Sequence, residues 1–326
     1  MSFQIKRAAV LGAGVMGSAI AAHLANAGVP TFLLDIVPPE LTEEEQRRGL
    51  KNDSPAFRNR FAASGVENAL KASPPAFFSP KDAQLITIGN VEDNLDWLSQ
   101  ADWIVEAVAE RPDIKQALFG KVEAHRKPGA FISSNTSGIP IRTLAEGRSQ
   151  EFRQHFLGTH FFNPPRYMKL LELIPGPETL PTVMHAMADF GERALGKGIV
   201  FAKDTPNFIA NRIGTFGLFA VMRIMVDGDY SIEEVDRLTG PAIGRPKSAT
   251  FRTADLIGLD TVAHIATNIA QALSEERERL AYDIPFFLED LVQRGWLGEK
   301  TGQGVYKRVK GTDGSDILVL DYRTME

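Results

Sequence analysis

The residues Lys6-Arg-Ala-Ala-Val-Leu-Gly-Ala-Gly-Val-Met-Gly17 decide the fold of this chain. An apolar strand runs into three glycines, and an alanine-rich helical stretch from Ser18 to Ala27 follows them. A loop of this kind needs Gly12 for a tight turn, Gly14 for close approach of the backbone to a pyrophosphate, and Gly17 for close packing of helix on strand. We therefore predict a dinucleotide-binding β–α–β unit.

The N-terminus of that helix is expected to face the phosphates of the dinucleotide, because its first backbone N–H groups have no partner within the helix. A second strand, Thr31 to Leu34, ends at Asp35, where a carboxylate accepts hydrogen bonds from the adenosine ribose. Ile36 follows at a place where an enzyme for NADP would offer an arginine, which favours NAD. The cofactor-binding residues predicted here are Gly12, Gly14, Val15, Met16, Gly17 and Asp35.

Strand-like segments recur at the rhythm of a doubly wound, mostly parallel sheet of the Rossmann type. They are Leu85 to Ile88, Trp103 to Ala107, Ala130 to Ser134, Phe156 to His160, Leu170 to Ile174 and Gly198 to Ala202. After residue 202 the pattern becomes helical. We expect an α/β domain over 1–202 with a helical arm at about 38–80, an all-helical domain over 203–308, and a tail or linker over 309–326.

Four helices are expected in the second half of the chain. Thr205-Pro206 predicts the start of a helix that runs to about Val226, with threonine as the cap and proline in the first turn. Ser231-Ile-Glu-Glu234 is a capping box that opens the next one. The remaining two are expected over 255–273 and 286–294.

The composition bounds the class of protein. A net charge of −5 argues against binding to a nucleic-acid backbone, and the absence of cysteine removes disulfides, thiolate nucleophiles and cysteine zinc sites. No spacing of ligand residues suggests a metal site. The apolar start, Ala8 to Leu11, is too short for a signal peptide, and arginines interrupt the apolar stretch 213–226, so neither a leader nor a membrane span is expected. We expect a cytoplasmic protein.

A histidine and a glutamate flank an Asn-Pro-Pro turn. His160 closes one strand-like run, and Glu172 lies within the next. If the two runs lie side by side, the pair can act as a base and the carboxylate that orients it. The alternative is a histidine hydrogen-bonded at a strand end beside an unrelated carboxylate.

Polar residues gather where two further strands end. Glu110 and Lys115 follow the strand at 103–107, and Asn135 and Ser137 follow the strand at 130–134. Ligands of open α/β sheets bind at these carboxyl ends. Such side chains could hold a nicotinamide or a substrate oxygen, or could cap a turn.

Together these segments resemble the L-3-hydroxyacyl-CoA dehydrogenases of fatty-acid β-oxidation, from Lys6 to Arg308. The resemblance is nearest to the N-terminal dehydrogenase part of bacterial multifunctional β-oxidation proteins, which carry an enoyl-CoA hydratase region after it. The matching segments, in chain order, are Gly12-Ala-Gly-Val-Met-Gly17, Val105-Glu-Ala-Val-Ala-Glu110, Ser134-Asn-Thr-Ser137, His160-Phe-Phe-Asn-Pro164, Lys203-Asp-Thr-Pro-Asn-Phe-Ile-Ala-Asn-Arg212 and Lys300-Thr-Gly-Gln-Gly-Val-Tyr306.

The resemblance implies oxidation of an (S)-3-hydroxyacyl-CoA to the 3-oxoacyl-CoA with NAD as the cofactor. His160 would be the acid–base residue oriented by Glu172, with Ser137 and Asn211 near the substrate oxygen. Further positions match residues that contact NAD in the family: Asp35, Glu110, Lys115 and Lys300. The chain departs from the family at Gly138, where many relatives have serine, and at Val305, where phenylalanine is common.

The resemblance also implies an acyl-CoA as the binding partner, with the helical arm contacting coenzyme A. On composition alone, the mixed charge of the arm favours a pair of solvated helices over a phosphate-binding surface. The resemblance reverses this order and favours phosphate binding, without assigning it to a single residue. The resemblance is compatible with a homodimer that forms through the helical domain. It is also compatible with a chain that is a fragment of a longer protein, with further β-oxidation domains beyond the tail. Two rival functions stay open: a dehydrogenase of free hydroxy acids or sugar acids, and a dinucleotide-binding protein without turnover.

Overall fold

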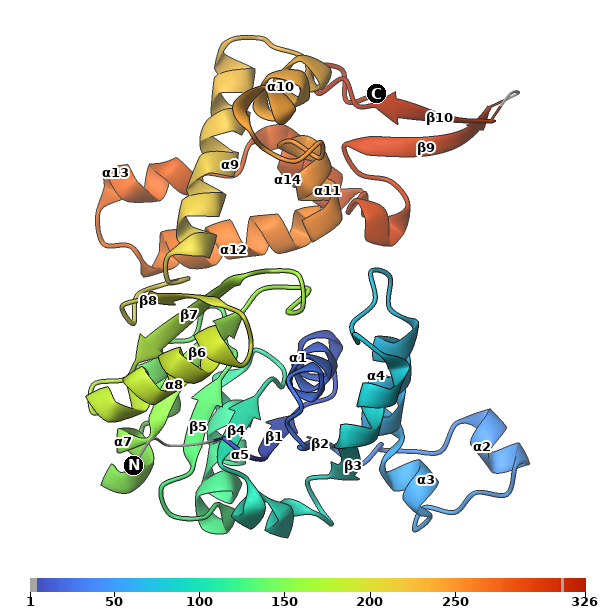
Figure 1. The fold of residues 1–326 in the computed structure, drawn as a ribbon. Helices are drawn as coiled ribbons and strands as arrows, with labels where there is room; N and C mark the ends of the chain where they lie inside the picture. Colours follow the sequence, from blue (N-terminus) through green and yellow to red (C-terminus); the bar gives the residue numbers. More distant parts are fainter. Residues whose placement is uncertain (1–4, 312–313) are drawn as a thin grey trace. The chain divides into compact units, whose positions relative to one another are not determined.

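The computed structural model describes residues 5–311 and 314–326 and divides into two compact units, Met1–Phe208 and Ile209–Glu326 (Figure 1). Each unit has a hydrophobic core of its own. The division falls six residues after the boundary expected from the change of periodicity at Ala202.

An eight-stranded sheet forms the first unit, in the order β3-β2-β1-β4-β5-β6-β7-β8. Neighbouring strands run parallel except for the antiparallel pair β6–β7. This confirms the predicted doubly wound, mostly parallel sheet. The strands are β1 (Ala8–Leu11), β2 (Thr31–Asp35), β3 (Ile86–Asn90), β4 (Trp103–Glu106), β5 (Phe131–Ser134), β6 (Phe156–Phe161), β7 (Leu170–Pro175) and β8 (Gly198–Phe201).

Helices flank this sheet (Figure 1). Every residue of β1 and β4 is buried, which is typical of central strands of a parallel sheet that is covered on both faces. The helices of the unit are α1 (Val15–Asn26), α2 (Glu43–Arg47), α3 (Pro55–Arg58), α4 (Arg60–Lys71), α5 (Pro112–His125), α6 (Ile141–Leu144), α7 (Gln150–Gln154) and α8 (Pro181–Arg193), with short 3₁₀ turns at Pro80–Leu85 and Leu95–Gln100.

The helical arm lies between β2 and β3 and consists of α2, α3 and α4. The first helix of the arm, α2, is short, because Thr42 caps it at the start and Gly49 adopts a positive φ of 72° just after its end. The basic side chains of the arm pair largely with carboxylates of the same unit: Arg47 with Glu43, Arg48 with Glu44, Arg60 with Glu45, Lys71 with Glu67, and Arg58 with Glu92 and Asp93. The three pairs of α2 and α4 that are exposed on both sides, Arg47–Glu43, Arg48–Glu44 and Lys71–Glu67, contribute little to stability.

The second unit is helical, and its core draws on nearly every helix. The capping box predicted at Ser231 is present, with Ser231 and Glu234 satisfying each other's backbone N–H groups. The elements are α9 (Ala210–Asp227), α10 (Ile232–Thr239), α11 (Phe251–Ile257), α12 (Leu259–Ala272), α13 (Glu276–Arg279) and α14 (Phe286–Gln293), 3₁₀ turns at Pro241–Ile243, Leu280–Tyr282 and Glu299–Thr301, and the strands β9 (Tyr306–Gly311) and β10 (Gly314–Val319).

Two expected helix boundaries are wrong. The helix expected to start at Thr205-Pro206 begins only at Ala210, because Asn207 and Phe208 adopt φ angles of 56° and 53°, which a right-handed helix cannot contain. The single helix expected over 255–273 is two helices, α11 and α12, because Gly258 adopts a φ of 98° between them.

The expected tail or linker is also wrong for the residues that the structure describes. β9 and β10 pair antiparallel, and Leu320 and Tyr322 are buried in the core of the second unit. The aromatic and aliphatic side chains after the hairpin bury apolar surface against the helices of the second unit. The helical pattern of the preceding residues does not predict this packing. Thr312 and Asp313 of the expected linker lie outside the described residues.

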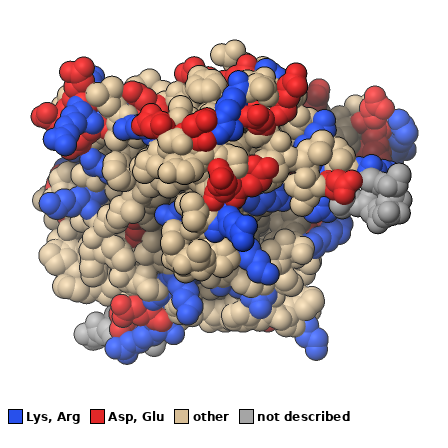
Figure 2. All heavy atoms as spheres, turned by 90° about the horizontal axis from the view of Figure 1, so that it is seen from above, with Lys and Arg blue, Asp and Glu red and all other residues tan. Residues whose placement is uncertain are grey.

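Lysine and arginine side chains intermingle with aspartate and glutamate side chains over the face seen in Figure 2. Within residues 5–311 and 314–326, no helix has both the length and the apolar character to cross a bilayer. The same residues contain no group of three or more histidine, aspartate or glutamate side chains arranged to hold a metal ion.

A buried histidine in α1 gives the first unit a dependence on pH. His23 is 6% exposed, its Nε2–H donates to the Leu195 carbonyl at 3.1 Å, and burial and the charge of Lys197 lower its pKa to about 4. The unfolded chain therefore takes up a proton below about pH 6.5, which the folded protein does not do until about pH 4, so stability falls as the pH falls between these values.

We expect this histidine to remove about 2 kcal/mol from the free energy of unfolding between pH 7 and pH 5. His23→Gln keeps a donor for Leu195 and cannot titrate, so its stability should decline less over that range. Urea unfolding of both proteins at the two pH values measures the difference. Equal declines would contradict the prediction.

Candidate active site

The glycine loop after β1 has room for nothing larger than glycine at two positions. Gly12 adopts a φ of 101°, and a Cβ there would lie 2.6 Å from the Ala107 carbonyl oxygen. A Cβ at Gly17 would lie 1.8 Å from the carbonyl oxygen of Gly12. The loop, the start of α1 and the end of β4 are thus in backbone contact, as expected for a dinucleotide-binding turn.

The third glycine faces open space. A Cβ at Gly14 would have no protein atom within 4 Å. The φ of −67° at this position suits any residue, so neither space nor backbone conformation within the protein requires a glycine here. Val15 beside it is 73% exposed, and no side chain caps the N-terminus of α1. Free N–H groups beside an open approach suit a pyrophosphate, so the loop fits a dinucleotide.

Asp35 lies where β2 ends and holds this loop in place. One carboxylate oxygen accepts from the N–H of Ala13 and the other from the N–H of Ile36 at 2.7 Å. Asp35 is the last residue of β2, the strand next to β1, which is the position expected of a ribose-binding carboxylate. The contact with the adenosine ribose stays a prediction.

The carboxylate of Asp35 also bears on the choice of cofactor. A 2′-phosphate beside it would bring two negative charges together, and the neighbouring side chain, Ile36, is apolar and exposed. We expect purified protein to bind NADH at least tenfold more tightly than NADPH in a fluorescence titration. Tighter binding of NADPH would contradict the prediction.

His160 and Glu172 lie directly opposite each other in the antiparallel pair β6–β7. The His160 Nδ1–H donates to a Glu172 carboxylate oxygen at 2.7 Å, and both side chains are almost completely buried. Phe162 and Phe208 border the imidazole, with ring centroids 4.4 and 5.5 Å from it. The two strand-like runs thus lie side by side, and the predicted contact between the two residues is present.

The other imidazole nitrogen faces Ser137. Its hydroxyl lies 3.0 Å from His160 Nε2. Since Nδ1 carries the proton that is donated to Glu172, Nε2 has its lone pair free to accept from a hydroxyl group. The arrangement places an oriented base beside a hydroxyl at the carboxyl end of the sheet.

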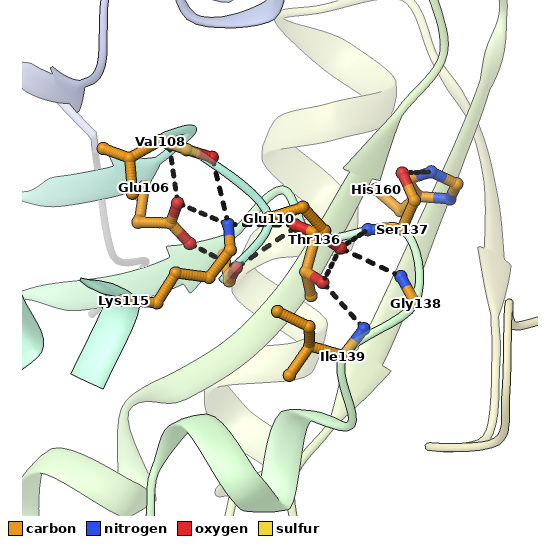
Figure 3. A network of polar contacts seen from close by, with 10 residues as sticks. Glu106, Val108, Glu110, Lys115, Thr136, Ser137, Gly138, Ile139 and His160 are labelled. Carbon is orange, nitrogen blue, oxygen red and sulfur yellow. Dashed lines mark hydrogen bonds and ion pairs between the residues drawn. The ribbon is translucent and has the colours of Figure 1, made fainter. Parts of the chain in front are cut away.

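Ser137 belongs to a short segment, residues 136–138, that Glu110 holds (Figure 3). One carboxylate oxygen of Glu110 accepts from the Thr136 hydroxyl and from the N–H groups of Ser137 and Gly138 at 2.9 and 3.1 Å. Burial alone would raise the pKa of Glu110, but Lys115 and these hydrogen bonds hold it below its usual range. Glu110 therefore stays ionised and holds the segment throughout the neutral range.

Lys115, predicted to contact the cofactor, is 1% exposed and lies between two carboxylates. Its ammonium is 2.6 Å from Glu106 and 3.2 Å from Glu110. Sequence analysis did not single out Glu106, which is completely buried at the end of β4. A glutamate among the apolar residues of a central strand, followed by a lysine in the next helix, is the signal that could have found it.

The remaining predicted residues divide between the units. Asn135 uses its amide oxygen to accept from the N–H of Phe161 at 3.0 Å, which ties the end of β5 to the end of β6. Asn211 lies in the first turn of α9, and Lys300 forms an ion pair with Asp260, both in the second unit. The contacts expected of Asn211 and Lys300 with substrate and cofactor stay predictions.

Comparison with known proteins agrees with this geometry. Residues 7–205 match the family model described as 3-hydroxyacyl-CoA dehydrogenase, NAD binding domain, and residues 208–308 match the model of its C-terminal domain. A probable 3-hydroxyacyl-CoA dehydrogenase of Bacillus subtilis (strain 168) is 53% identical over 326 residues, which are 100% of this chain and 41% of that protein. The chain thus spans less than half the length of that relative.

Two further proteins extend the comparison. A probable 3-hydroxyacyl-CoA dehydrogenase of Deinococcus radiodurans is 48% identical over 307 residues, which are 94% of this chain and 84% of that protein. The crystal structure of FadB2 from M. tuberculosis superposes with a TM-score of 0.75 at 29% identity and covers 94% of this chain and 100% of that one.

A dinucleotide-binding sheet with an oriented histidine at its carboxyl edge is the arrangement found in NAD-dependent dehydrogenases. Within that class, the chain belongs to the 3-hydroxyacyl-CoA dehydrogenase family.

Proposed function

We propose that this protein catalyses the reversible, NAD-dependent oxidation of an (S)-3-hydroxyacyl-CoA to the 3-oxoacyl-CoA in fatty-acid β-oxidation. The observation that carries the proposal is the His160 ring, held by Glu172 at one nitrogen and directed at Ser137 by the other. The substrate class rests on membership of the family.

In the proposed reaction, His160 Nε2 accepts the proton of the substrate's 3-hydroxyl group as the hydride leaves C3. The bound NAD⁺ is the hydride acceptor. Glu172, which is 0% exposed, accepts the hydrogen bond from Nδ1, stabilises the imidazolium that results and keeps the proton on Nδ1. In the reverse direction the imidazolium returns the proton to the carbonyl oxygen.

Ser137 binds the substrate oxygen in this proposal, and Asn211 supplies a second hydrogen bond from α9. The glycine loop would hold the pyrophosphate of the dinucleotide, and Asp35 would accept hydrogen bonds from its adenosine ribose. Further contacts to the dinucleotide would come from Glu110, Lys115, Asn135 and Lys300. Phe162 and Phe208 beside the imidazole exclude water from the reacting atoms.

Coenzyme A contacts the helical arm in this proposal, with the basic side chains exchanging their exposed carboxylate partners for phosphates. The proposal has three further parts. Two copies of the chain pair through the helical unit, the chain belongs to a longer protein with further β-oxidation domains, and that protein is cytoplasmic. The long Bacillus relative supports the further domains.

Comparison of two substrates tests the reaction. We expect rapid consumption of NADH with acetoacetyl-CoA and turnover lower by at least two orders of magnitude with free acetoacetate, because the coenzyme A portion supplies binding energy that the free acid lacks. Consumption with the free acid alone would identify a hydroxy-acid dehydrogenase. Tight binding of NADH without turnover of either substrate would identify a binding protein.

A further inference from the structure

The Ser137 hydroxyl gets its position from a cluster that lies behind it, away from the imidazole. The segment 136–138 has no regular secondary structure, and a single oxygen atom of Glu110 accepts three hydrogen bonds from it. Thr136, which is buried, spans this contact, because its hydroxyl donates to Glu110 and also accepts from the N–H of Ile139 at 3.0 Å.

Glu110 is in turn fixed from within the sheet. Its second oxygen lies 3.2 Å from the Lys115 ammonium, which is 2.6 Å from the buried Glu106. Besides the contact with Lys115, Glu106 accepts two hydrogen bonds, from the N–H of Val108 at 2.7 Å and from the Ser134 hydroxyl at 2.5 Å. The inner part of this network, Glu106 with Lys115 and Ser134, is buried and fully hydrogen-bonded, while Glu110 is half exposed at its outer end. The buried part therefore links the position of β4 and β5 to Glu110 and the loop (Figure 3).

We propose that Glu106, Lys115 and Glu110 form a positioning cluster that, through Thr136, sets the Ser137 hydroxyl at hydrogen-bonding distance from His160. Glu106 and Thr136 are then positioning residues, and they act on the reaction only through Ser137. The kinetic part of this inference rests on the proposed function, but the placement of the hydroxyl does not.

The need for such a cluster follows from the geometry of proton transfer. A displacement of about 1 Å in an active-site group can cost 10²-fold in rate, and a serine on an irregular segment has no helix or strand to hold it. Three hydrogen bonds to one ionised oxygen give that segment a fixed point, because charge-assisted bonds are stronger than neutral ones.

A spectroscopic test needs neither substrate nor cofactor. In protein labelled with ¹⁵N at histidine, the Nε2 signal of His160, identified by its loss in His160→Gln, reports the hydrogen bond to Ser137. We expect Thr136→Val to shift this signal and Thr136→Ser, which keeps the hydroxyl, to restore it. Thr31→Val removes an equally buried threonine hydroxyl, bonded to the Val29 carbonyl, and should leave the signal unchanged.

The kinetic test uses the same variants with acetoacetyl-CoA. We expect Thr136→Val to lower kcat about tenfold, with NADH affinity within twofold of the original protein and recovery in Thr136→Ser. In a Ser137→Ala background, Thr136→Val should have no further effect, because it acts through the missing hydroxyl.

Glu106→Gln, equal in shape but uncharged, tests the far end of the cluster. Lys115 then has Glu110 as its carboxylate partner and at most a neutral amide oxygen at position 106, so the balance of the cluster changes and the Nε2 signal should shift as it does in Thr136→Val. If this variant does not fold, the two Thr136 variants decide the matter.

Three results would overturn the inference: an unchanged Nε2 signal in Thr136→Val, an equal loss of kcat with and without Ser137, or a loss of NADH affinity alone. Absence of turnover in the unaltered protein would refute the proposed function and leave the spectroscopic result to judge the cluster.

Discussion

Replacing His160 with glutamine should lower kcat with acetoacetyl-CoA by about 10²–10⁴-fold, which is the usual contribution of a positioned acid–base group. The imidazole is the group whose Nε2 faces Ser137, and a glutamine amide cannot take up or release a proton there. NADH affinity should be nearly unchanged, because the glycine loop lies at the ends of other strands. Steady-state kinetics and a fluorescence titration measure the two effects.

Two further variants separate lost chemistry from lost structure. His160→Asn places an amide near the position of Nδ1, where it can still donate to the buried carboxylate of Glu172, so it should be as inactive and more stable than His160→Gln. His185→Gln changes an exposed histidine of α8 and should leave turnover unaltered. Turnover of the His160 variants within tenfold of the original would refute the assignment.

Gly17→Ala should abolish detectable NADH binding and destabilise the first unit by on the order of 3 kcal/mol. The added methyl group would lie 1.8 Å from the Gly12 carbonyl oxygen, and neither backbone segment can withdraw without opening the turn between β1 and α1. Thermal unfolding and NADH titration measure both effects.

The Gly14→Ala variant should lose NADH affinity without losing stability. Its methyl group meets no protein atom within 4 Å, so stability should be unchanged, while NADH affinity should fall at least tenfold, because the methyl occupies the approach of the pyrophosphate. Gly198→Ala, at the exposed start of β8, serves as the control for both measurements. Normal binding by Gly14→Ala would place the dinucleotide elsewhere.

The strands, and the contact between His160 and Glu172, could be predicted because their cause is local. Apolar runs of four to six residues, each ended by glycine or a polar residue, define the strands, and a short turn between two of them favours an antiparallel pair. The glycine loop could also be predicted from the sequence, because each of its three glycines is required for a different steric reason.

What escaped prediction depends on atoms distant in sequence or on single φ angles. Glu106 and Lys115 each have an ordinary place in a strand or helix, and only the folded unit brings them within 2.6 Å. The positive φ angles at Asn207 and Phe208 override a good capping sequence at Thr205-Pro206. Gly258 is different, because a glycine within a predicted helix is itself a sequence signal for a helix end. The helical periodicity continues on both sides of it over 19 residues and led to the prediction of one helix where the structure has two.

The antiparallel pairing of β6 with β7 has a consequence for how this family can change. Side chains alternate between the two faces of a strand, so a slip of one residue in β7 would place a leucine, Leu171 or Leu173, opposite His160. The base would lose its counter-charge, and the buried carboxylate of Glu172 would move to the other face of the sheet, away from His160. We therefore expect insertions in the loop between the two strands to be compatible with activity wherever the register stays unchanged. A one-residue deletion within β7 that shifts the register should separate Glu172 from His160.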